Sequence, residues 1–412
     1  MSVENNIPKH WQIKKFEDFL DYIQPTPFIV ESTDYSDNHK IPVLTAGKSF
    51  ILGKTNEKNG IFNSLPVIIF DDFTTANKFV NFPFKVKSSA MKILKPKNEL
   101  VNIKFVFYYM QTVRITYDTH KRYWISIFSQ LPVPSPPLHE QQAIVSKIEE
   151  LLSDLENGKQ QLQTAQQQLK VYRQSLLKWA FEGKLTNKNL KEGELPKGWQ
   201  VESLSKVAKI VSGFAFKSSD FVPDGIPVVK ISNIGYSEFV WKDQQYLPKE
   251  FLKSNPDFVL RSGDLLIALT RPITNNTTKV CQYPSNTGDA LLNQRVACIK
   301  ELKANKDFIF LFFQTNVFKE YIRSKFSETL QPNLSPKDLA LTPIPVCSFE
   351  EQQLIVSELE SKLTVCDKIE ETISQSLQQA ETLRQSILKK AFEGKLVQTE
   401  VFTDKKRNYY EQ

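Results

Sequence analysis

The chain has 412 residues and a net charge of +7, from 53 Lys and Arg residues against 46 Asp and Glu residues. Its length predicts two or three domains, and its 41% of hydrophobic residues can build folded cores, which excludes a wholly disordered chain. The basic excess is mild and does not by itself indicate a nucleic-acid partner.

The first globular block, residues 11–131, combines short strands with a helix. Apolar runs at residues 41–44 and 66–70 are flanked by Gly, Asn or Pro and predict strands, and residues 102–111 predict a helix. The aromatic side chains of that helix fit a buried core, and a base-stacking surface is the alternative.

A long helix is predicted next. Pro136 and Pro137 can start it, Gly183 is a natural C-terminal cap, and its length is about 44 residues, or roughly 65 Å at 1.5 Å per residue. Apolar side chains recur every three or four residues, as in a coiled-coil seam, with Gly158 as the weak position. The seam residues are Ile144, Ile148, Leu151, Leu155, Leu162, Ala165, Leu169, Tyr172 and Leu176.

The second half of the chain follows the same plan. Residues 199–342 contain strand-like runs at 226–231 and 264–268 and a helix-like run at 308–326. A second long helix begins at a capping-box pattern in residues 348–351 and ends at Gly394. Its seam residues are Ile355, Leu359, Leu363, Cys366, Ile369, Ile373, Ala380, Leu383 and Ile387.

The two long helices are copies of one sequence. Glu-Gln-Gln at 140–142 recurs at 351–353, Arg-Gln-Ser at 173–175 recurs at 384–386, and Ala-Phe-Glu-Gly-Lys-Leu at 180–185 recurs at 391–396, all with an offset of 211 residues. Pro132 and Pro134 recur at the same offset. The Pro-Lys-x-Trp motif at 8–11 recurs at 196–199 with an offset of 188, so the blocks between the motifs differ in length. A fixed arm holds geometry, whereas the variable block carries the specific task.

We therefore expect an α+β fold in which two mixed α/β domains are separated by two long antiparallel coiled-coil helices in a pseudo-twofold repeat. The predicted segments are 1–134 and 187–345 for the domains, 135–186 and 346–397 for the helices, and 398–412 for a tail. Each seam has to be buried. The other helix of the chain is the simplest partner, and packing of each helix on its own domain is the alternative.

Cysteine and histidine spacing predicts no metal site. No two of the four cysteines are spaced as in a zinc knuckle, and the four histidines lie in the other half of the chain. Free cysteines fit a reducing compartment. The polar start of the sequence and the shortness of its apolar runs predict a soluble cytoplasmic protein.

Sequence motifs of the common catalytic sites are missing. There is no Asn/Asp-Pro-Pro-aromatic segment of an adenine methyltransferase, no Gly-rich cofactor loop after a strand and no phosphate-binding GxxxxGK[ST] loop. Glu-Gly-Lys at 182–184 and 393–395 resembles part of a metal-dependent nuclease site, but both copies lie at helix ends, where a cap is the better interpretation. We therefore expect no covalent chemistry.

The repeated motifs resemble those of the specificity subunit of type I restriction–modification enzymes, the HsdS family. The motifs are Pro-Lys-x-Trp before each block, Pro-x-Pro and Glu-Gln-Gln at each helix start, and the segment from Arg-Gln-Ser to Gly-Lys-Leu at each helix end. Residues 331–335, ahead of Pro343, fit as well. The resemblance covers essentially the whole chain. One departure is His10, which stands where the second copy has Gly198, in a turn.

The resemblance implies a non-catalytic DNA-binding subunit. Its two target-recognition domains would each read one half of a bipartite, asymmetric site in double-stranded DNA. The helices would space the domains and dock two modification (methyltransferase) subunits, to which restriction subunits with motor and nuclease activity would be added. S-adenosylmethionine, ATP and Mg would be used by those partners, with no cofactor bound by this chain.

Basic and amide side chains in loops are the expected DNA contacts, because Arg or Lys recognises guanine and Asn or Gln recognises adenine. In the first block they are Lys48, Thr74, Thr75, Asn77, Lys78, His120, Lys121, Arg122 and Tyr123. In the second block they are Arg271, Asn275, Asn276, Lys279, Gln294, Arg295, Gln331 and Asn333. A phosphate contact or an ordinary solvated side chain is the alternative for each, and a structural role is the alternative for residues 291–295.

Two other classes of protein stay open. An enzyme with an unrecognised nuclease or methyltransferase site would turn over DNA without partners. A coiled-coil interaction protein would protect no bipartite site. Within the family, a subunit that serves a fused methyltransferase–nuclease partner would show the same architecture.

Overall fold

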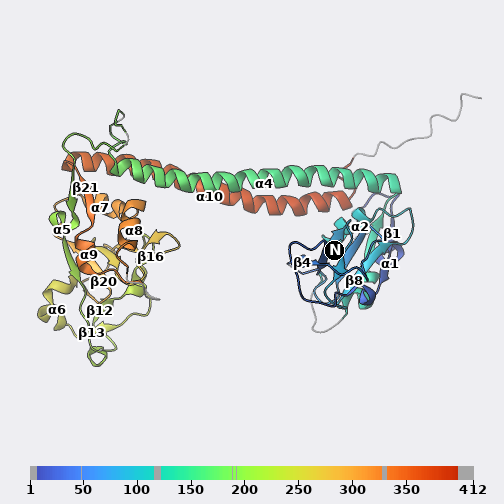
Figure 1. Ribbon diagram of the computed structural model, residues 1–412, viewed down its shortest axis with the longest axis horizontal. Helices are drawn as coiled ribbons and strands as arrows, with labels where there is room; N and C mark the ends of the chain where they lie inside the picture. Colours follow the sequence, from blue (N-terminus) through green and yellow to red (C-terminus); the bar gives the residue numbers. More distant parts are fainter. Residues whose placement is uncertain are drawn as a thin grey trace, which may run out of the picture. The chain divides into compact units, whose positions relative to one another are not determined.

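The computed structural model describes residues 7–47, 49–115, 122–187, 189–191, 193–326 and 332–397. Contacts divide the chain into a first unit, Met1–Leu162 with Ser374–Gln412, and a second unit, Gln163–Ile373. Each unit contains one globular domain and a segment of both long helices (Figure 1). The predicted α+β class with two mixed domains and two long helices is confirmed.

The first domain is built on two sheets. The four-stranded antiparallel sheet has the order β2 (Leu20–Ile23), β8 (Met91–Pro96), β5 (Val67–Asp71) and β6 (Asn77–Val80). The three-stranded sheet has the order β4 (Ile51–Thr55), β3 (Ile41–Leu44) and β7 (Lys85–Val86), with β3 parallel to β7. The helices of this domain are α1 (Phe16–Phe19), α2 (Ile103–Met110) and α3 (Tyr123–Ser126).

The second domain repeats this topology with additions. Its first sheet has the order β11 (Lys209–Ser212), β20 (Val296–Lys300), β15 (Leu265–Ala268) and β18 (Val280–Gln282). Its second sheet has the order β13 (Tyr246–Leu247), β12 (Ile226–Val229), β19 (Ala290–Leu292) and β14 (Val259–Leu260), and β12 is parallel to β19, as β3 is to β7. The hairpin β16 (Ile273–Thr274) and β17 (Thr277–Thr278) lies between β15 and β18. The helices are α5 (Leu204–Val207), α6 (Phe251–Ser254), α7 (Lys306–Phe312), α8 (Asn316–Arg323) and α9 (Pro336–Ala340).

A central strand with two buried faces organises each core. In β15, Leu265 and Ile267 pack with α7 and the long helices, whereas Leu266 and Ala268 pack toward the second sheet. Strand β5 divides its side chains in the same way. Side chains that alternate between two apolar layers explain why these strands are continuous apolar runs in the sequence.

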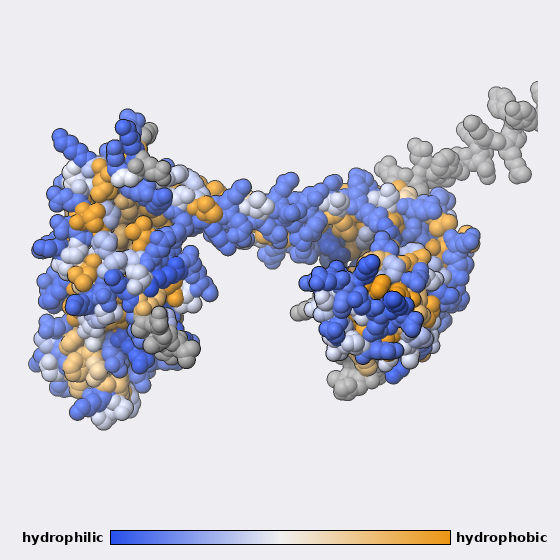
Figure 2. All heavy atoms as spheres, in the orientation of Figure 1, coloured by the Kyte–Doolittle hydropathy of each residue, from blue (hydrophilic) through white to orange (hydrophobic). Residues whose placement is uncertain are grey.

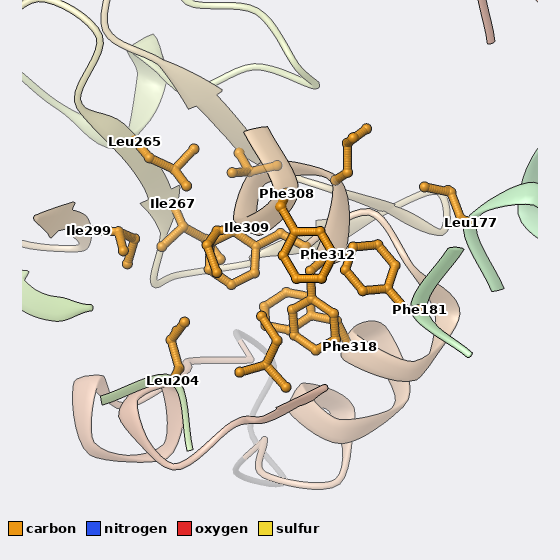
Figure 3. Close-up of a cluster of buried hydrophobic side chains, with 14 of the residues drawn as sticks. Leu177, Phe181, Leu204, Leu265, Ile267, Ile299, Phe308, Ile309, Phe312 and Phe318 are labelled. Carbon is orange, nitrogen blue, oxygen red and sulfur yellow. The ribbon is translucent and has the colours of Figure 1, made fainter. Parts of the chain in front are cut away.

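A phenylalanine at the end of each long helix fills the same place in each domain. Phe181 of α4 (Leu138–Phe181) lies 4.7 Å from Phe308 and 5.3 Å from Phe312 between ring centroids (Figure 3). Phe392 of α10 (Phe349–Phe392) contacts Phe105 and Tyr109 at 5.2 and 5.0 Å. Each domain therefore packs on the beginning of one long helix and the end of the other, so helix–helix and helix–domain packing both occur.

A buried joint explains the Glu-Gln pair at the start of each long helix. The Trp11 indole N–H donates to Glu140 at 2.8 Å, and that of Trp199 donates to Glu351 at 3.0 Å. Gln141 accepts a hydrogen bond from the backbone N–H of Asn102, the residue that caps α2. Gln352 accepts the same bond from Asn305, which caps α7. The Glu-Gln dipeptide therefore attaches two parts of each domain to the long helix. They are the tryptophan at the start of the domain and the N-terminus of α2 or α7.

The last residue of the Glu-Gln-Gln motif lies outside the joint, whereas His10, the departure from the repeat, contacts it. Gln142 and Gln353 are exposed in both copies and take no part in the joint. His10 Nε2 lies 2.8 Å from Glu140. In the second unit, where Gly198 stands in place of His10, Thr186 and Asn187 donate to Glu351 instead. The departure from the repeat is thus compensated locally.

Two glycines allow the Pro-Lys-x-Trp segment that begins each domain to lie close to the end of a long helix. Gly183 has φ +74°, and a Cβ there would lie 2.2 Å from Pro196 Cγ. Gly394 has φ +68°, and a Cβ there would lie 2.3 Å from Pro8 Cγ. The adjacent Glu and Lys pair with each other, at 2.7 Å for Glu182 and Lys184. The Glu-Gly-Lys segment is therefore a helix end, as the sequence indicates.

Within each unit the two helical segments run antiparallel. In the first unit, Lys159 lies 2.7 Å from Glu381, and early α4 residues share a core with late α10 residues. In the second unit, Arg173 pairs with Asp367 and with Glu370. Side chains seven residues apart form the main seam: Ile148, Leu155, Leu162, Leu169 and Leu176 on α4, and Leu359, Cys366, Ile373, Ala380 and Ile387 on α10. This is the 3.5-residue repeat of a coiled coil.

The second column of the seam differs from the predicted one. Tyr172, Ile369 and Leu383 were predicted to be buried in the seam, but they are 44, 44 and 50% exposed, so that prediction is wrong. The half-buried column lies on the other flank and includes Lys159, Gln166, Arg173 and, on α10, Glu370, Leu377 and Arg384. An apolar pattern shows only part of this column, Leu363 and Leu377, because the long cationic side chains in it pack their methylene stems and keep their charged ends near water.

Gly183→Ala should destabilise the second unit, because the left-handed φ disfavours a side chain and Pro196 occupies the space. We expect a loss of about 2 kcal/mol or more in free energy of unfolding, measured by chemical denaturation.

Gly158→Ala is the matched control. Gly158 lies in the interior of α4, and no atom lies within 4 Å of an added Cβ. Alanine should therefore stabilise the helix by about 1 kcal/mol. Equal effects of the two substitutions would contradict the close approach at Gly183.

Candidate nucleic-acid interface

In the first domain, two separate segments meet at the end of the central strand β5. The backbone N–H of Tyr123 donates to the Asp72 carbonyl at 2.9 Å, and the N–H of Trp124 donates to the Asp72 carboxylate at 2.9 Å. The loop that follows β5 contains Thr74 and Thr75. The structure therefore places this loop next to Arg122, so the candidate DNA contacts of the two segments lie close together.

The candidate side chains of this loop differ in availability. Thr74 and Arg122 are exposed, whereas Thr75, Asn77 and Lys78 are half-buried. Asn77 donates to the Thr75 carbonyl at 3.1 Å and accepts from Gln111, so its amide group is used within the domain. Arg122 and Lys78 have no acidic partner within 4 Å in the part of the chain that the structure describes.

One candidate of the first domain is wrong, and several cannot be placed. Tyr123 is only 2% exposed and lies in the core beneath the loop, so its ring cannot contact DNA. In the sequence it stands between the basic residue Arg122 and the apolar residues Trp124 and Ile125, so the local pattern does not distinguish a buried from an exposed tyrosine. Lys48, His120 and Lys121, together with Gln331 of the second domain, lie outside the described residues.

A buried ion pair supports the loop of the first domain. Lys92 of β8 is fully buried, and its ammonium group lies 3.6 Å from the carboxylate of Asp72, which is 2% exposed. The same group donates to Gln24 at 3.2 Å. Asp72 is the residue that holds the segment 122–124, so the charge pair fixes both parts of the candidate interface.

In the second domain, backbone hydrogen bonds gather the candidates around the end of β15. Leu269, the residue after β15, donates its N–H to the carbonyl of Arg295 at 2.8 Å. Arg271 donates to the carbonyl of Pro332 at 2.8 Å, and Thr270 bridges to Asn333. Lys279 donates to Pro272 at 2.7 Å. Segments up to 63 residues apart in the sequence therefore supply one surface.

Most of the candidate side chains on this surface are exposed to solvent. Arg271, Asn275, Asn276, Gln294, Arg295 and Asn333 are exposed, and Lys279 is half-buried. In residues 291–295, Leu291 and Leu292 are buried in the sheet, so only the end of this segment can reach a ligand. Among the described residues, no acidic side chain lies within 4 Å of Arg271, Lys279 or Arg295. Unpaired guanidinium groups suit phosphate oxygens and guanine edges.

The candidate positions coincide with unusual backbone geometry. Eight non-glycine residues have positive φ in the described chain, and five of them are candidates. They are Thr75 (56°), Arg271 (48°), Asn275 (49°), Asn276 (59°) and Arg295 (71°). Such conformations cost of order 1 kcal/mol or more each and persist where the surroundings impose them, commonly at binding sites.

Sequence analysis missed a basic residue beside this surface. Arg323, at the end of α8, donates through Nη2 to the side-chain oxygen of Asn276 at 2.7 Å. The two residues lie 47 positions apart in the sequence. No local pattern connects them, and only the fold brings α8 to the β16–β17 turn.

Three of the four cysteine thiols have a raised pKa, which favours the protonated form. Burial raises the pKa of the Cys281 and Cys347 thiols to about 12 and also raises the pKa of Cys298. All four cysteines are unpaired. In the described ranges, no group of three or more His, Cys, Asp or Glu residues gathers as a metal site would require.

The two candidate interfaces occupy equivalent positions. Each lies in the connection after an inner strand of a four-stranded sheet, β5 to β6 in the first domain and β15 to β18 in the second. Each also contacts the segment that precedes the last strand of its domain, β9 (Pro132–Ser135) or β21 (Pro343–Val346). The connection is longer in the second domain, which adds the β16–β17 hairpin.

Comparison with protein families assigns both halves of the chain. Residues 8–164 and 196–379 each match the family model described as the type I restriction modification DNA specificity domain. The chain belongs to this family of type I specificity subunits. Its two domains are therefore DNA-specificity domains, and its candidate interfaces are parts of target-recognition domains.

Two curated relatives match over most of their lengths. The type I restriction enzyme MjaVIII specificity subunit of Methanocaldococcus jannaschii is 27% identical over 407 residues, which cover 95% of this chain and 94% of the relative. The EcoR124I/EcoR124II specificity subunit of Escherichia coli is 31% identical over 390 residues, with 87 and 88% covered.

Solved structures share the fold. The HsdS subunit from Thermoanaerobacter tengcongensis aligns with a TM-score of 0.61 at 19% identity and covers 94% of this chain and 98% of that one. A chain from a study of complex assembly and conformational transition in a type I restriction–modification system aligns with a TM-score of 0.68 at 17% identity, covering 94 and 99%. No described helix is both long and apolar enough to cross a membrane.

Lys92→Ala should destabilise the first domain by about 3 kcal/mol, because it leaves the buried Asp72 carboxylate without a cation. Denaturant unfolding of the purified chain measures this loss. The double variant Lys92→Met with Asp72→Asn should recover part of it.

Lys95→Ala is the control for the Lys92 variant. Lys95 lies on the same strand and carries the same charge, but it has no ion pair in the described chain. We expect a change within about 0.5 kcal/mol. A similar loss for both variants would show that the pair with Asp72 is not what supports the loop.

Proposed function

We propose that the chain is the DNA-recognition subunit of a type I restriction–modification complex and that it reads a bipartite, asymmetric DNA site, one half-site per domain. The observation that carries this proposal is the equivalence of the two candidate interfaces. Two domains of one topology present basic side chains without an acidic partner at the same place among the described residues, but the side chains around them differ. Two different readers on equivalent scaffolds suit two different half-sites.

We further propose that this subunit is not catalytic. Among the described residues, its candidate interfaces contain cations, amides and threonine hydroxyls, and three of its four cysteine thiols are buried. Methylation with S-adenosylmethionine, and ATP- and Mg-dependent translocation and cleavage, would be carried out by modification and restriction subunits. The unpaired cysteines suit action in the cytoplasm.

The long helices are the proposed docking surface for two modification subunits. Exposed side chains that recur at the offset of 211 have no role in the joint, which supports contact with two copies of one partner. Examples are Gln142 with Gln353, Ser146 with Ser357, and Lys178 with Lys389. The surface over the helices is mostly hydrophilic with separate apolar patches (Figure 2).

A groove in the second unit offers one such apolar patch. It has a volume of about 740 Å³ and lies between α4 and the start of α8. Val171 and Val317 line it and are 68 and 55% exposed. Gln174 and Lys178, which also line it, recur as Gln385 and Lys389. A recurring polar frame around apolar side chains suits a permanent subunit contact.

Arg295→Ala should weaken recognition of one half-site only, and Arg122→Ala should weaken recognition of the other. We expect about 1–3 kcal/mol of lost discrimination for each, measured by binding of the reconstituted complex to DNA with single-base changes in each half. The site itself comes from mapping methylated positions in the source genome.

A phosphate contact would give a different result. It would weaken all sequences alike and reduce the slope of log affinity against log salt by about 1. Lys249→Ala, which removes an exposed charge elsewhere in the second domain, should leave discrimination unchanged. Loss at both half-sites from one substitution would contradict the assignment of one half-site to each domain.

Val171→Asp and Leu169→Asp separate docking from stability. Leu169 is 8% exposed, so Leu169→Asp should cost about 3 kcal/mol of unfolding free energy. Val171→Asp should leave stability within about 0.5 kcal/mol and yet reduce association with the modification subunit. Thermal denaturation and size-exclusion chromatography of the mixture measure the two effects. Full association of Val171→Asp would exclude the groove as a docking site.

A further inference from the structure

The turn of the β16–β17 hairpin is held by two basic side chains from α8. Asn275 and Asn276 form the turn, and both have positive φ. Lys319 donates to the backbone carbonyl of Asn276 at 3.1 Å, and Arg323 donates to its side-chain oxygen at 2.7 Å. Lys319 and Arg323 are four residues apart and therefore lie on one face of the helix.

Lys319 is buried without an acidic partner. Its exposure is 3%, and no acidic side chain of the described residues lies within 4 Å of its ammonium group. Burial, and then the nearby Arg323, lower the pKa of Lys319. Lysine is rarely buried unless it is paired, because its charge is costly to remove from water. A lysine that is buried at this cost in free energy is expected to have a specific role.

The same lysine reaches the long helix. Its ammonium group lies 3.5 Å from the side-chain oxygen of Gln174 on α4. Lys319 of α8 thus links the hairpin turn to α4. The turn emerges between β15 and β18 and stands beside Arg271 and Lys279, two candidate DNA contacts.

We propose that Lys319 and Arg323 are positioning residues for recognition of the second half-site, which they support by clamping the Asn275–Asn276 turn in the conformation that meets DNA. This inference rests on the proposed function. A turn with both residues left-handed matches the twist of a hairpin, but a two-stranded hairpin with only two residue pairs is marginally stable by itself and gains from such contacts. The clamp pre-organises the turn, so less entropy is lost on binding. Among the described residues of the first domain, the connection from β5 to β6 contains no such hairpin, so we expect the effect at one half-site only.

Lys319→Met and Arg323→Met test the clamp in the complex with the modification subunit. Methionine keeps the apolar stem and removes the charge, and the loss of a buried charge should not prevent folding. Each variant should lower discrimination at the second half-site about tenfold and leave the first half-site unchanged. Lys325→Met removes an equal charge just beyond α8, where Lys325 lies over the Tyr321 ring, and should change neither half-site.

A double-mutant cycle distinguishes the clamp from direct phosphate contact by Arg323. If Arg323 acts through the turn, Arg323→Met should have little further effect once Asn276→Ala has removed its acceptor. Additive losses with a reduced salt slope would instead assign Arg323 to phosphate and overturn its part in the clamp. Unchanged discrimination in Lys319→Met would overturn the part of Lys319. If the wild-type complex itself showed no site preference, the proposed function would fail, a result distinct from failure of the clamp.

Discussion

The Glu-Gln pair at the start of each long helix, buried except for the half-buried Glu351, is the contact on which the rest of the architecture depends. Its carboxylate holds the tryptophan at the domain entrance, and its amide holds the cap of an internal helix, Asn102 or Asn305. A buried polar group left without its partner is costly, so these bonds fix the orientation of the domain on the helix more tightly than apolar packing alone would. Since both copies use the same bonds, both domains meet their helices with one geometry.

That fixed geometry allows the opposite end of the central strand to vary. The loops after β5 and β15 differ in length and sequence, yet each emerges at the same place and is held by interior groups of its own domain. In the first domain the support is a buried ion pair, Lys92 with Asp72, and in the second it is the cation Lys319 beneath a hairpin. Different buried groups beneath equivalent loops are expected when two DNA-specificity domains of one fold diverge.

The sequence predicted much of the fold, because repeats and helical periodicity are local patterns. The two helices, their ends at Gly183 and Gly394, and the fixed offset of 211 were all visible. A third repeat was overlooked: Asn102 and Phe105 recur as Asn305 and Phe308 with an offset of 203, and this spacing could have paired α2 with α7. The half-buried Lys159 and Arg173 of the seam, the buried Tyr123 and the contact of Arg323 with Asn276 could not be predicted, since each depends on which surface the fold brings alongside.

The joint at Gly394 has a consequence for the order of folding during synthesis. The second unit is one continuous stretch of chain, whereas the first unit combines residues before 163 with residues after 373. Phe392 packs on Phe105 and Tyr109, and Pro8 lies against Gly394. These contacts can form only after the ribosome has synthesised residue 394. With synthesis at roughly 5–20 residues per second, the first domain stays without its α10 segment for tens of seconds, during which the apolar surface beneath Phe392 is uncovered.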